Sequence, residues 1–212
     1  VNYKPELLRS MDNPMDPEGG LAVVRGNLAP TGAIIKPTAA SQSLLTHQGR
    51  ALVFEDHDDL LARIDDPDLD VRPEDVLVMR NGGPIGAPGM PEWGFLPLPK
   101  KILATGVRDM VRLSDARMSG TAFGTVVVHV TPESAAGGPL AAVRTGDQIL
   151  LDVPNRKLDL LVEEREIRSR LVGTPPVAPR YNRGYGWMYA QHAQQADQGC
   201  DFDFLRSDFT GG

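Results

Sequence analysis

Gly124-Thr-Val-Val-Val-His-Val130 is an apolar run of strand length, and the sequence repeats this kind of run along most of its length. Each run is closed by Gly, Pro, Asn or Asp, and β-branched residues dominate, as is typical of strands. The candidate strands are Leu21–Val24, Ala33–Ile35, Ala51–Phe54, Val76–Met79, Met110–Leu113, Val126–Val128, Leu140–Val143, Ile149–Val153 and Leu158–Val162. Nine strands of this length predict a mainly β unit.

Helical spacing is confined to a few segments. Between the strands it covers Asp56–Ile64, Pro97–Thr105 and Glu163–Leu171, and after them it covers Tyr185–Gln195. The predicted fold class is therefore mainly β with α (α+β). A β-barrel or sandwich with covering helices and a C-terminal helical tail fits this order of elements best.

Composition divides the 212 residues into three parts. Residues 1–20 are polar and rich in turn formers, residues 21–172 hold the strands, and residues 173–212 begin with an extended proline linker and continue into the helical tail. The chain starts at Val1 rather than at Met, which predicts that it begins inside a longer protein. We therefore expect residues 1–20 to be a linker from a preceding domain.

Charge and cysteine content exclude several classes of function. The chain has 22 Lys and Arg against 28 Asp and Glu, and this net charge of -6 argues against nucleic acid or an anionic membrane as a partner. Its apolar runs fall far short of the ~20 residues that span a bilayer. One cysteine, Cys200, cannot form an intrachain disulfide, a thiolate zinc site or an iron–sulfur cluster by itself, so a cytoplasmic protein is predicted.

The densest concentration of Gly and Pro is Arg80-Asn-Gly-Gly-Pro-Ile-Gly-Ala-Pro-Gly-Met-Pro-Glu-Trp-Gly94. It lacks the Gly-Lys-Ser/Thr of a phosphate-binding loop, and no suitable helix begins at its last glycine. A structural connector and a ligand-facing loop both remain open. The second reading is favoured by Glu92, the only carboxylate in the segment, because Mg²⁺ takes carboxylate oxygens.

A second small and polar stretch is Leu113-Ser-Asp-Ala-Arg-Met-Ser-Gly-Thr-Ala-Phe-Gly-Thr125. Four of its side chains are hydroxyls: Ser114, Ser119, Thr121 and Thr125. They could face a ligand, or they could satisfy the backbone of a long turn. No Gly-x-Ser-x-Gly elbow is present, so a hydrolase triad is not expected.

The remaining chemically interesting side chains favour structural roles. His129 lies inside a candidate strand, where a buried structural histidine is expected rather than a base or ligand. Cys200 is expected to pack, not to react. The acidic run Asp65–Asp70 lacks the spacing and glycine of a calcium loop and is expected to be a solvated turn.

Three motifs together carry a family resemblance. They are Arg80 to Glu92, Ser114-Asp-Ala-Arg-Met-Ser-Gly-Thr121, and His129-Val-Thr-Pro-Glu-Ser-Ala-Ala-Gly-Gly-Pro139. In this order and spacing, they resemble the carboxy-terminal domain of the IlvD/Edd dehydratases, over residues of about 13 to 171. That family contains dihydroxy-acid, phosphogluconate and sugar-acid dehydratases, and the resemblance implies a swivelling β/β/α barrel.

Two features favour the sugar-acid branch. Dihydroxy-acid enzymes tend to have Gly-Arg-Phe-Ser-Gly where this chain has Ala116-Arg-Met-Ser-Gly-Thr121. The tail from Arg183 to Leu205 looks like that of the L-arabinonate and D-xylonate dehydratases. The resemblance therefore implies loss of water from a pentonate or hexonate. Dihydroxy-acid dehydration, or a non-catalytic binding or assembly module, is the alternative.

The resemblance also implies what lies outside this chain. The family's amino-terminal domain supplies the cysteines of a 2Fe-2S or 4Fe-4S cluster and most Mg²⁺ ligands, so the isolated chain is expected to be inactive. In this sequence the family's base falls on Ser119 and its carboxy-terminal Mg²⁺ ligand falls on Glu92, with Thr121 a weaker candidate for substrate contact. Expected partners are that domain, a small sugar acid, and further copies in a homodimer or homotetramer.

Overall fold

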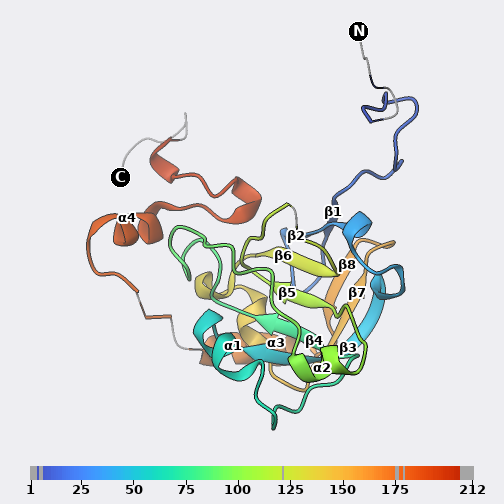
Figure 1. Cartoon of the computed structure of the whole chain (residues 1–212). Coiled ribbons are helices and arrows are strands. Elements are labelled where there is room, and N and C mark those ends of the chain that lie inside the picture. Colours follow the sequence, from blue (N-terminus) through green and yellow to red (C-terminus); the bar gives the residue numbers. More distant parts are fainter. Residues whose placement is uncertain (1–3, 5–6, 121, 175–176, 179, 206–212) are drawn as a thin grey trace.

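The computed structural model describes residues 4, 7–120, 122–174, 177–178 and 180–205, and its centre is one eight-stranded sheet. The strands are β1 (Ala22–Val24), β2 (Gly32–Ile35), β3 (Thr46–Phe54), β4 (Val76–Met79), β5 (Arg112–Ser114), β6 (Val126–Thr131), β7 (Gln148–Asp152) and β8 (Lys157–Leu160). Their order across the sheet is β1-β2-β6-β5-β4-β3-β7-β8 (Figure 1). Thr121, the predicted substrate contact, lies outside the described residues.

The sheet curls until its two edges meet. The four central strands, β3 to β6, run parallel, and the outer pairs are antiparallel. At the edges, the Arg25 N–H donates to the Arg156 carbonyl at 2.9 Å, and the Leu158 N–H donates to the Arg25 carbonyl at 2.9 Å. The side chain of Asn27 adds bonds to both backbone groups of Leu160, at 2.8 and 2.7 Å. The result is a nearly closed barrel, as predicted.

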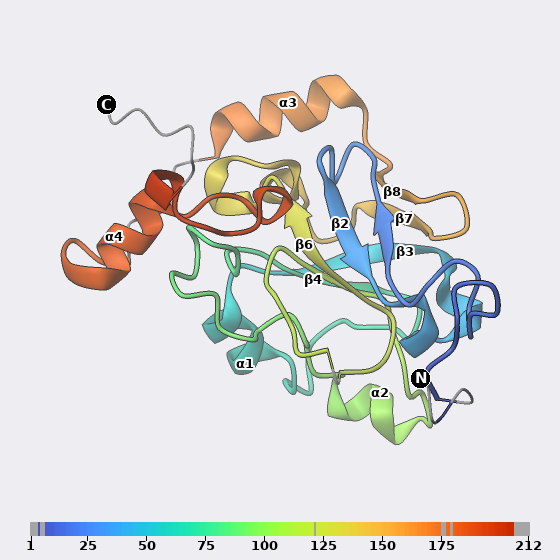
Figure 2. The same cartoon turned by 90° about the horizontal axis from the view of Figure 1, so that it is seen from above.

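Most of the central strands are buried on both faces, which explains why their sequences are continuously apolar rather than alternating. Val53 of β3 and Val78 of β4 belong to the core inside the barrel, which Ile167 of α3 (Glu164–Gly173) joins. Their neighbours Leu52 and Leu77 face a second core, which α1 (His57–Arg63) and α2 (Lys100–Ala104) cover. In Figure 2, α3 lies on the opposite side of the barrel from α1 and α2.

Eight of the nine expected strands are present, and the expected strand at Leu140–Val143 is wrong. Pro139 to Ala142 instead form a 3-10 helix, η4, with the proline at its start. Proline fixes φ near the helical range and cannot donate to a strand ladder, so this short apolar run turns rather than extends. The apolar residues of Leu140–Val143 indicate that the segment is buried, but they do not show whether it forms a strand or a 3-10 helix.

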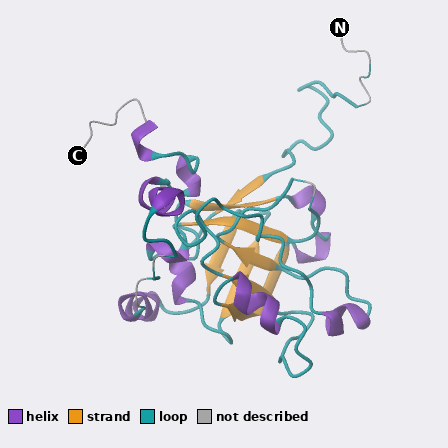
Figure 3. Cartoon of the chain, turned by 60° about the vertical axis from the view of Figure 1, so that its left-hand side comes forward, coloured by secondary structure: helices purple, strands orange, loops and turns teal. Residues whose placement is uncertain are grey.

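The helices predicted from spacing are all found; α1, α2 and α3 begin one to three residues later than predicted, whereas α4 (Gly184–His192) begins one residue earlier and ends three residues earlier. Asp56 caps α1 by accepting from the Asp59 N–H at 2.9 Å. Short 3-10 helices complete the described elements: η1 (Pro37–Ala39), η2 (Gln42–Leu44), η3 (Ser134–Ala136), η5 (Ala196–Gln198) and η6 (Asp203–Leu205). Figure 3 shows the strands at the centre and the helices around them, and Figures 1 and 2 show α4 at a distance from the strands. No helix among the described residues is long and apolar enough to cross a membrane.

Candidate functional site

The two loops singled out in the sequence leave the same edge of the sheet. The Gly- and Pro-rich loop, residues 80–94, follows β4, and the hydroxyl-rich loop, residues 115–125, follows β5. Because β4 and β5 are parallel neighbours, their carboxyl ends meet at one edge, a place where α/β proteins commonly bind ligands.

Two glycines of residues 80–94, Gly82 and Gly83, allow the backbone of the loop to lie very close to neighbouring side chains. A Cβ on Gly82 would lie 2.7 Å from the Ala116 Cβ, and one on Gly83 would lie 2.5 Å from Oε2 of Glu133. Both distances are shorter than real Cβ contacts allow. The loop is therefore pressed against its neighbours and is not a loose connector.

Two buried carboxylates hold this loop by its backbone. Asp115 accepts from the Gly82 N–H at 2.8 Å, and Glu133 accepts from the Ile85 N–H at 2.9 Å and the Gly86 N–H at 3.0 Å. Burial raises the pKa of both carboxyls above their ordinary values, against the opposing effect of these hydrogen bonds.

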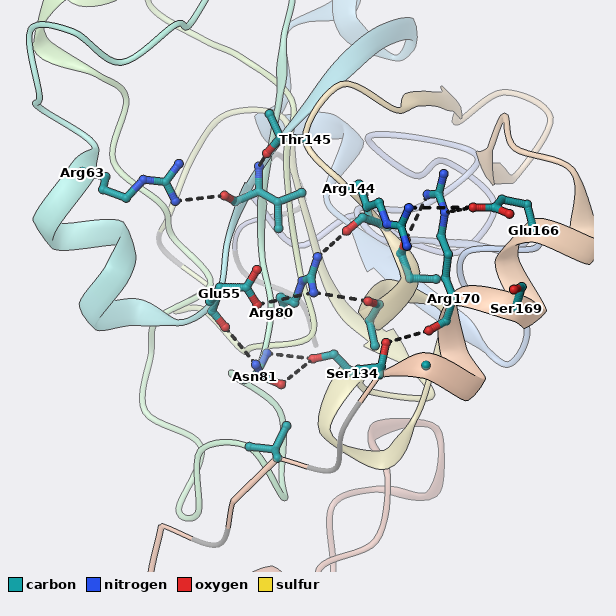
Figure 4. Close-up of a pocket in the computed structure, with 17 residues that line it drawn as sticks. Glu55, Arg63, Arg80, Asn81, Ser134, Arg144, Thr145, Glu166, Ser169 and Arg170 are labelled. Atoms are coloured by element: carbon teal, nitrogen blue, oxygen red, sulfur yellow. Dashed lines mark hydrogen bonds and ion pairs between the residues drawn. The ribbon is translucent and has the colours of Figure 1, made fainter.

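The root of the loop is fixed on its other side by Arg80 and Asn81. Arg80 donates to the carbonyls of Ala141 and Val143, and Asn81 donates to the Glu55 carbonyl at 2.9 Å (Figure 4). These residues line a cavity of about 670 Å³ that also takes side chains from α1 and α3. Neither Glu92 nor Ser119 lines that cavity, so it is separate from the predicted site residues.

Of the four hydroxyls in residues 113–125, two bind backbone N–H groups. Ser114 accepts from the Ala116 N–H at 3.0 Å, and Thr125 accepts from the Ser41 N–H at 3.2 Å while it donates to Asp109 at 2.7 Å. Both are fully buried, so the structural reading holds for them. Ser119 is half-buried, and its carbonyl accepts from the Ala122 N–H at 3.1 Å; Thr121 lies outside the described residues.

Asp109 anchors the far end of the same loop. Burial alone would raise its pKa, but hydrogen bonds from Thr125 and Ser41 bring the pKa of Asp109 below its ordinary value. Its carboxylate also pairs with buried Arg112 at 3.1 Å. A Cβ on Gly124, whose φ is +99°, would collide with that guanidinium.

Lys36, the residue directly after β2, contacts the hydroxyl-rich loop next to Ser119. Lys36 donates to the Gly120 carbonyl at 2.8 Å, and the Gly124 N–H donates to the Ala39 carbonyl at 2.7 Å. Lys36 was not predicted as a site residue. Its separation of 84 residues from Gly120 gives no sequence signal of their contact.

Arg117 joins the two loops. It donates from Nη1 to Oε1 of Glu92 at 2.8 Å and from Nε to the Met90 carbonyl, and its own carbonyl accepts from the Gly94 N–H at 2.8 Å. The side chains of Arg117 and Glu92 are both about half exposed. The predicted metal ligand and the segment carrying the predicted base, Ser119, are thus brought to one place at the surface.

The described residues do not make a complete metal site. No group of three or more His, Cys, Asp or Glu among them could hold an ion. Glu92 fits the role of one carboxylate ligand, because its exposed side chain can reach outward from a firmly held loop. A metal ion at Glu92 would need further ligands from outside the described residues.

His129 and Cys200 face another cavity, of about 400 Å³, between β2, β6 and η5. His129 has a φ of +54°, where the register between β2 and β6 shifts, and its N–H donates to the Ala116 carbonyl at 3.0 Å. Burial lowers the pKa of His129, with help from Arg117 nearby. Burial also raises the pKa of the Cys200 thiol, which agrees with a packing role for this residue.

Comparison with known proteins gives a consistent set of relatives. The family described as dihydroxy-acid/6-phosphogluconate dehydratase, C-terminal, matches residues 6–200. A 6-deoxy-6-sulfo-D-gluconate dehydratase of Pseudomonas putida is 51% identical over 97% of this chain, and an L-arabonate dehydratase of Azospirillum brasilense is 52% identical over 96%. A dihydroxy-acid dehydratase of Acetivibrio thermocellus is 41% identical over 92%. The chain spans only 35–36% of the length of these relatives.

Proposed function

Since this chain belongs to the dihydroxy-acid/6-phosphogluconate dehydratase family, we propose that it is the base-bearing, carboxy-terminal part of a sugar-acid dehydratase. The single observation that carries the proposal is the contact between Arg117 and Glu92, which unites the loops of the predicted base and the predicted metal ligand. The substrate class is supported by the higher identity to the arabonate and sulfogluconate enzymes, 52% and 51% against 41% for the dihydroxy-acid enzyme.

In the proposed reaction, the C2–H proton of a 2,3-dihydroxy acid is removed and the C3 hydroxyl leaves as water. The enol that remains becomes a 2-keto-3-deoxy acid. Ser119 would take the C2 proton. A serine hydroxyl is a weak base, so its anionic form needs nearby positive charge.

This chain supplies part of that charge. Lys36 is held at the Gly120 carbonyl, one residue after Ser119, and Arg117 lies two residues before it. Both cations favour an anion on this loop. Thr121 would contact the substrate from the same segment.

Glu92 would hold Mg²⁺ as one of several ligands, with Arg117 fixing one of its oxygens. When bound, Mg²⁺ would acidify the C2 proton through the substrate's carboxylate and C2 hydroxyl, and an iron–sulfur cluster held by cysteines outside this chain would accept the leaving hydroxyl. The chain's own task is to present Glu92 and Ser119 to that site from a rigid edge of the barrel.

The wider organisation follows from the same proposal. Residues 1–20 would link the barrel, 21–172, to an amino-terminal domain, and residues 173–212 would form the linker and tail. The assembly would be a homodimer or homotetramer acting in the cytoplasm, which suits a chain with one cysteine.

Ser119→Ala in the full-length, iron- and Mg²⁺-reconstituted protein tests the proposal. Turnover of pentonates and hexonates should fall by at least about 10³-fold with iron content unchanged, because the proton acceptor is gone. Ser169→Ala, at an exposed serine of α3, is the matched control and should turn over normally. Near-normal turnover by Ser119→Ala would refute the base assignment. A substrate screen that found only branched-chain dihydroxy acids would move the protein to the other branch.

A further inference from the structure

The tail after the proline linker, residues 180–205, lies against the Gly- and Pro-rich loop that carries Glu92. Figure 1 shows this tail beside that loop at the same end of the barrel. Contacts come from three separate positions of the tail: two meet residues 80–94 directly, and one meets Glu133, which is bonded to that loop. The proposed function uses none of them.

Gln195 makes the innermost contact, on Glu133. Its side-chain amide donates to Oε1 of Glu133 at 2.7 Å, and its side-chain carbonyl accepts from the Glu133 N–H at 2.9 Å. The same carboxylate holds the N–H groups of Ile85 and Gly86. Glu133 therefore stands between the tail and the Glu92 loop and is bonded to both.

Glu133 depends on these neutral donors. It is 1% exposed, and no Lys or Arg among the described residues forms an ion pair with it. A buried carboxylate without a cation is stabilised only by the hydrogen bonds that it accepts. Removing one of its three donor residues therefore leaves a poorly satisfied charge that can pull away from the loop.

Two outer contacts lie along the rest of the loop. The Arg180 guanidinium lies 5.6 Å from the ring centre of Trp93, the residue after Glu92, and the ring of His57 also stacks on Trp93 at 4.5 Å. Tyr185 and Tyr189 of α4 line a shared cavity with Pro88 and Gly89. The tail therefore meets the loop directly at Trp93 and near Pro88 and Gly89, and it meets the loop through Glu133 at Ile85 and Gly86.

We propose that Gln195 is a positioning residue: through Glu133 it fixes the loop that presents Glu92, so that the tail sets the geometry of the metal-binding side of the site. This inference rests on the proposed function for the role of Glu92. The Gln195–Glu133–loop connection itself stands on the contacts alone.

Amide hydrogen exchange of this chain, read by NMR, tests the connection without any catalysis. Gln195→Ala should speed exchange at Ile85 and Gly86 by about tenfold, since their shared acceptor is loosened. Gln194→Ala is the matched control: its side chain makes no hydrogen bond among the described residues, and its backbone N–H bond to Asp201 at 2.8 Å survives the substitution. Unchanged exchange at Ile85 and Gly86 in Gln195→Ala would overturn the proposal.

Divalent-metal dependence of the full-length holoprotein tests the consequence at Glu92. Gln195→Ala should raise the apparent Mg²⁺ requirement, and the dissociation constant for Mn²⁺ read by electron paramagnetic resonance, by about fivefold, with cluster content and the folded state unchanged. Faster exchange with unaltered Mg²⁺ and Mn²⁺ dependence would overturn the positioning role. Faster exchange in a protein whose wild type dehydrates no sugar acid would support the connection and count against the proposed function instead.

Discussion

Arg117 and Glu92, which are 25 residues apart in the sequence, form an ion pair between the two loops, with Nη1 and Oε1 separated by 2.8 Å. The same guanidinium donates to the Met90 carbonyl, so one side chain fixes both the carboxylate and the backbone before it. An arginine suits this place because its fork donates in two directions at once.

Arg117→Lys should reduce activity far more than stability. Lysine keeps the charge but cannot donate to the Met90 carbonyl and to Glu92 at the same time. The Glu92 carboxylate should therefore be less well positioned, and turnover of the full-length protein should fall about tenfold. Unfolding free energy should change by less than about 1 kcal/mol, because the pair is half exposed. Steady-state kinetics and urea unfolding measure the two effects. Arg168→Lys, in the exposed pair with Glu164 on α3, should alter neither.

Lys36→Met should lower kcat with little change in KM. The substitution removes the cation at the Gly120 carbonyl while keeping most of the apolar stem, so the basicity and placement of Ser119 should suffer rather than substrate binding. A loss of about tenfold in kcat is expected. Lys157→Met, at an exposed lysine of β8, serves as the control. Wild-type kcat in Lys36→Met would show that this cation takes no part.

Gly83→Ala should destabilise the fold by about 2 kcal/mol, the cost of forcing an extra methyl into a packed site. Its Cβ would lie 2.5 Å from Oε2 of Glu133 and would displace the acceptor of the Ile85 and Gly86 N–H groups. Urea unfolding measures the loss. Gly173→Ala, at the end of α3 with nothing within 4 Å of the added methyl, should leave stability within about 0.5 kcal/mol of wild type.

Acid should destabilise the hydroxyl-rich loop through Asp109. The folded-state pKa of Asp109 lies below its ordinary value of 3.8, so the folded state binds fewer protons there than the unfolded state. The resulting stability is present above that ordinary value and is lost as the pH falls through the folded-state pKa. Thermal unfolding from about pH 6 to about pH 2 should show a smaller loss for Asp109→Asn than for wild type. An equal loss in both would exclude Asp109 as a source of the acid sensitivity.

Local sequence pattern predicted the strands well where they are enclosed by turn formers. It failed at Leu140–Val143, because a buried 3-10 helix and a buried strand are equally apolar and only Pro139 distinguishes them. The helix at α1 was predictable from Asp56 and the spacing of Leu60 and Ile64. These sequence signals lie within or next to the helix or strand that they predict, so they can be recognised without knowing the fold.

The site is different, because its bonds run between segments far apart in the chain. Nothing near Glu133 in the sequence shows that it holds Ile85 and Gly86 or meets Gln195, 62 residues later. The contact of Lys36 with Gly120 is equally hidden. The roles of Ser119 and Glu92 came from resemblance, and they stay predictions; what the fold adds is that Arg117 brings their loops together.

Closure of the barrel has a consequence for how such a domain can be moved between proteins. Arg25, just after the first strand, is bonded to Arg156 and Leu158 around the start of the last one. The two ends of the barrel are therefore neighbours, and a chain can pass into it and out of it at adjacent junctions. A graft of the barrel into a related protein, or a circular permutation at a surface turn, would therefore keep the path of its core strands unchanged.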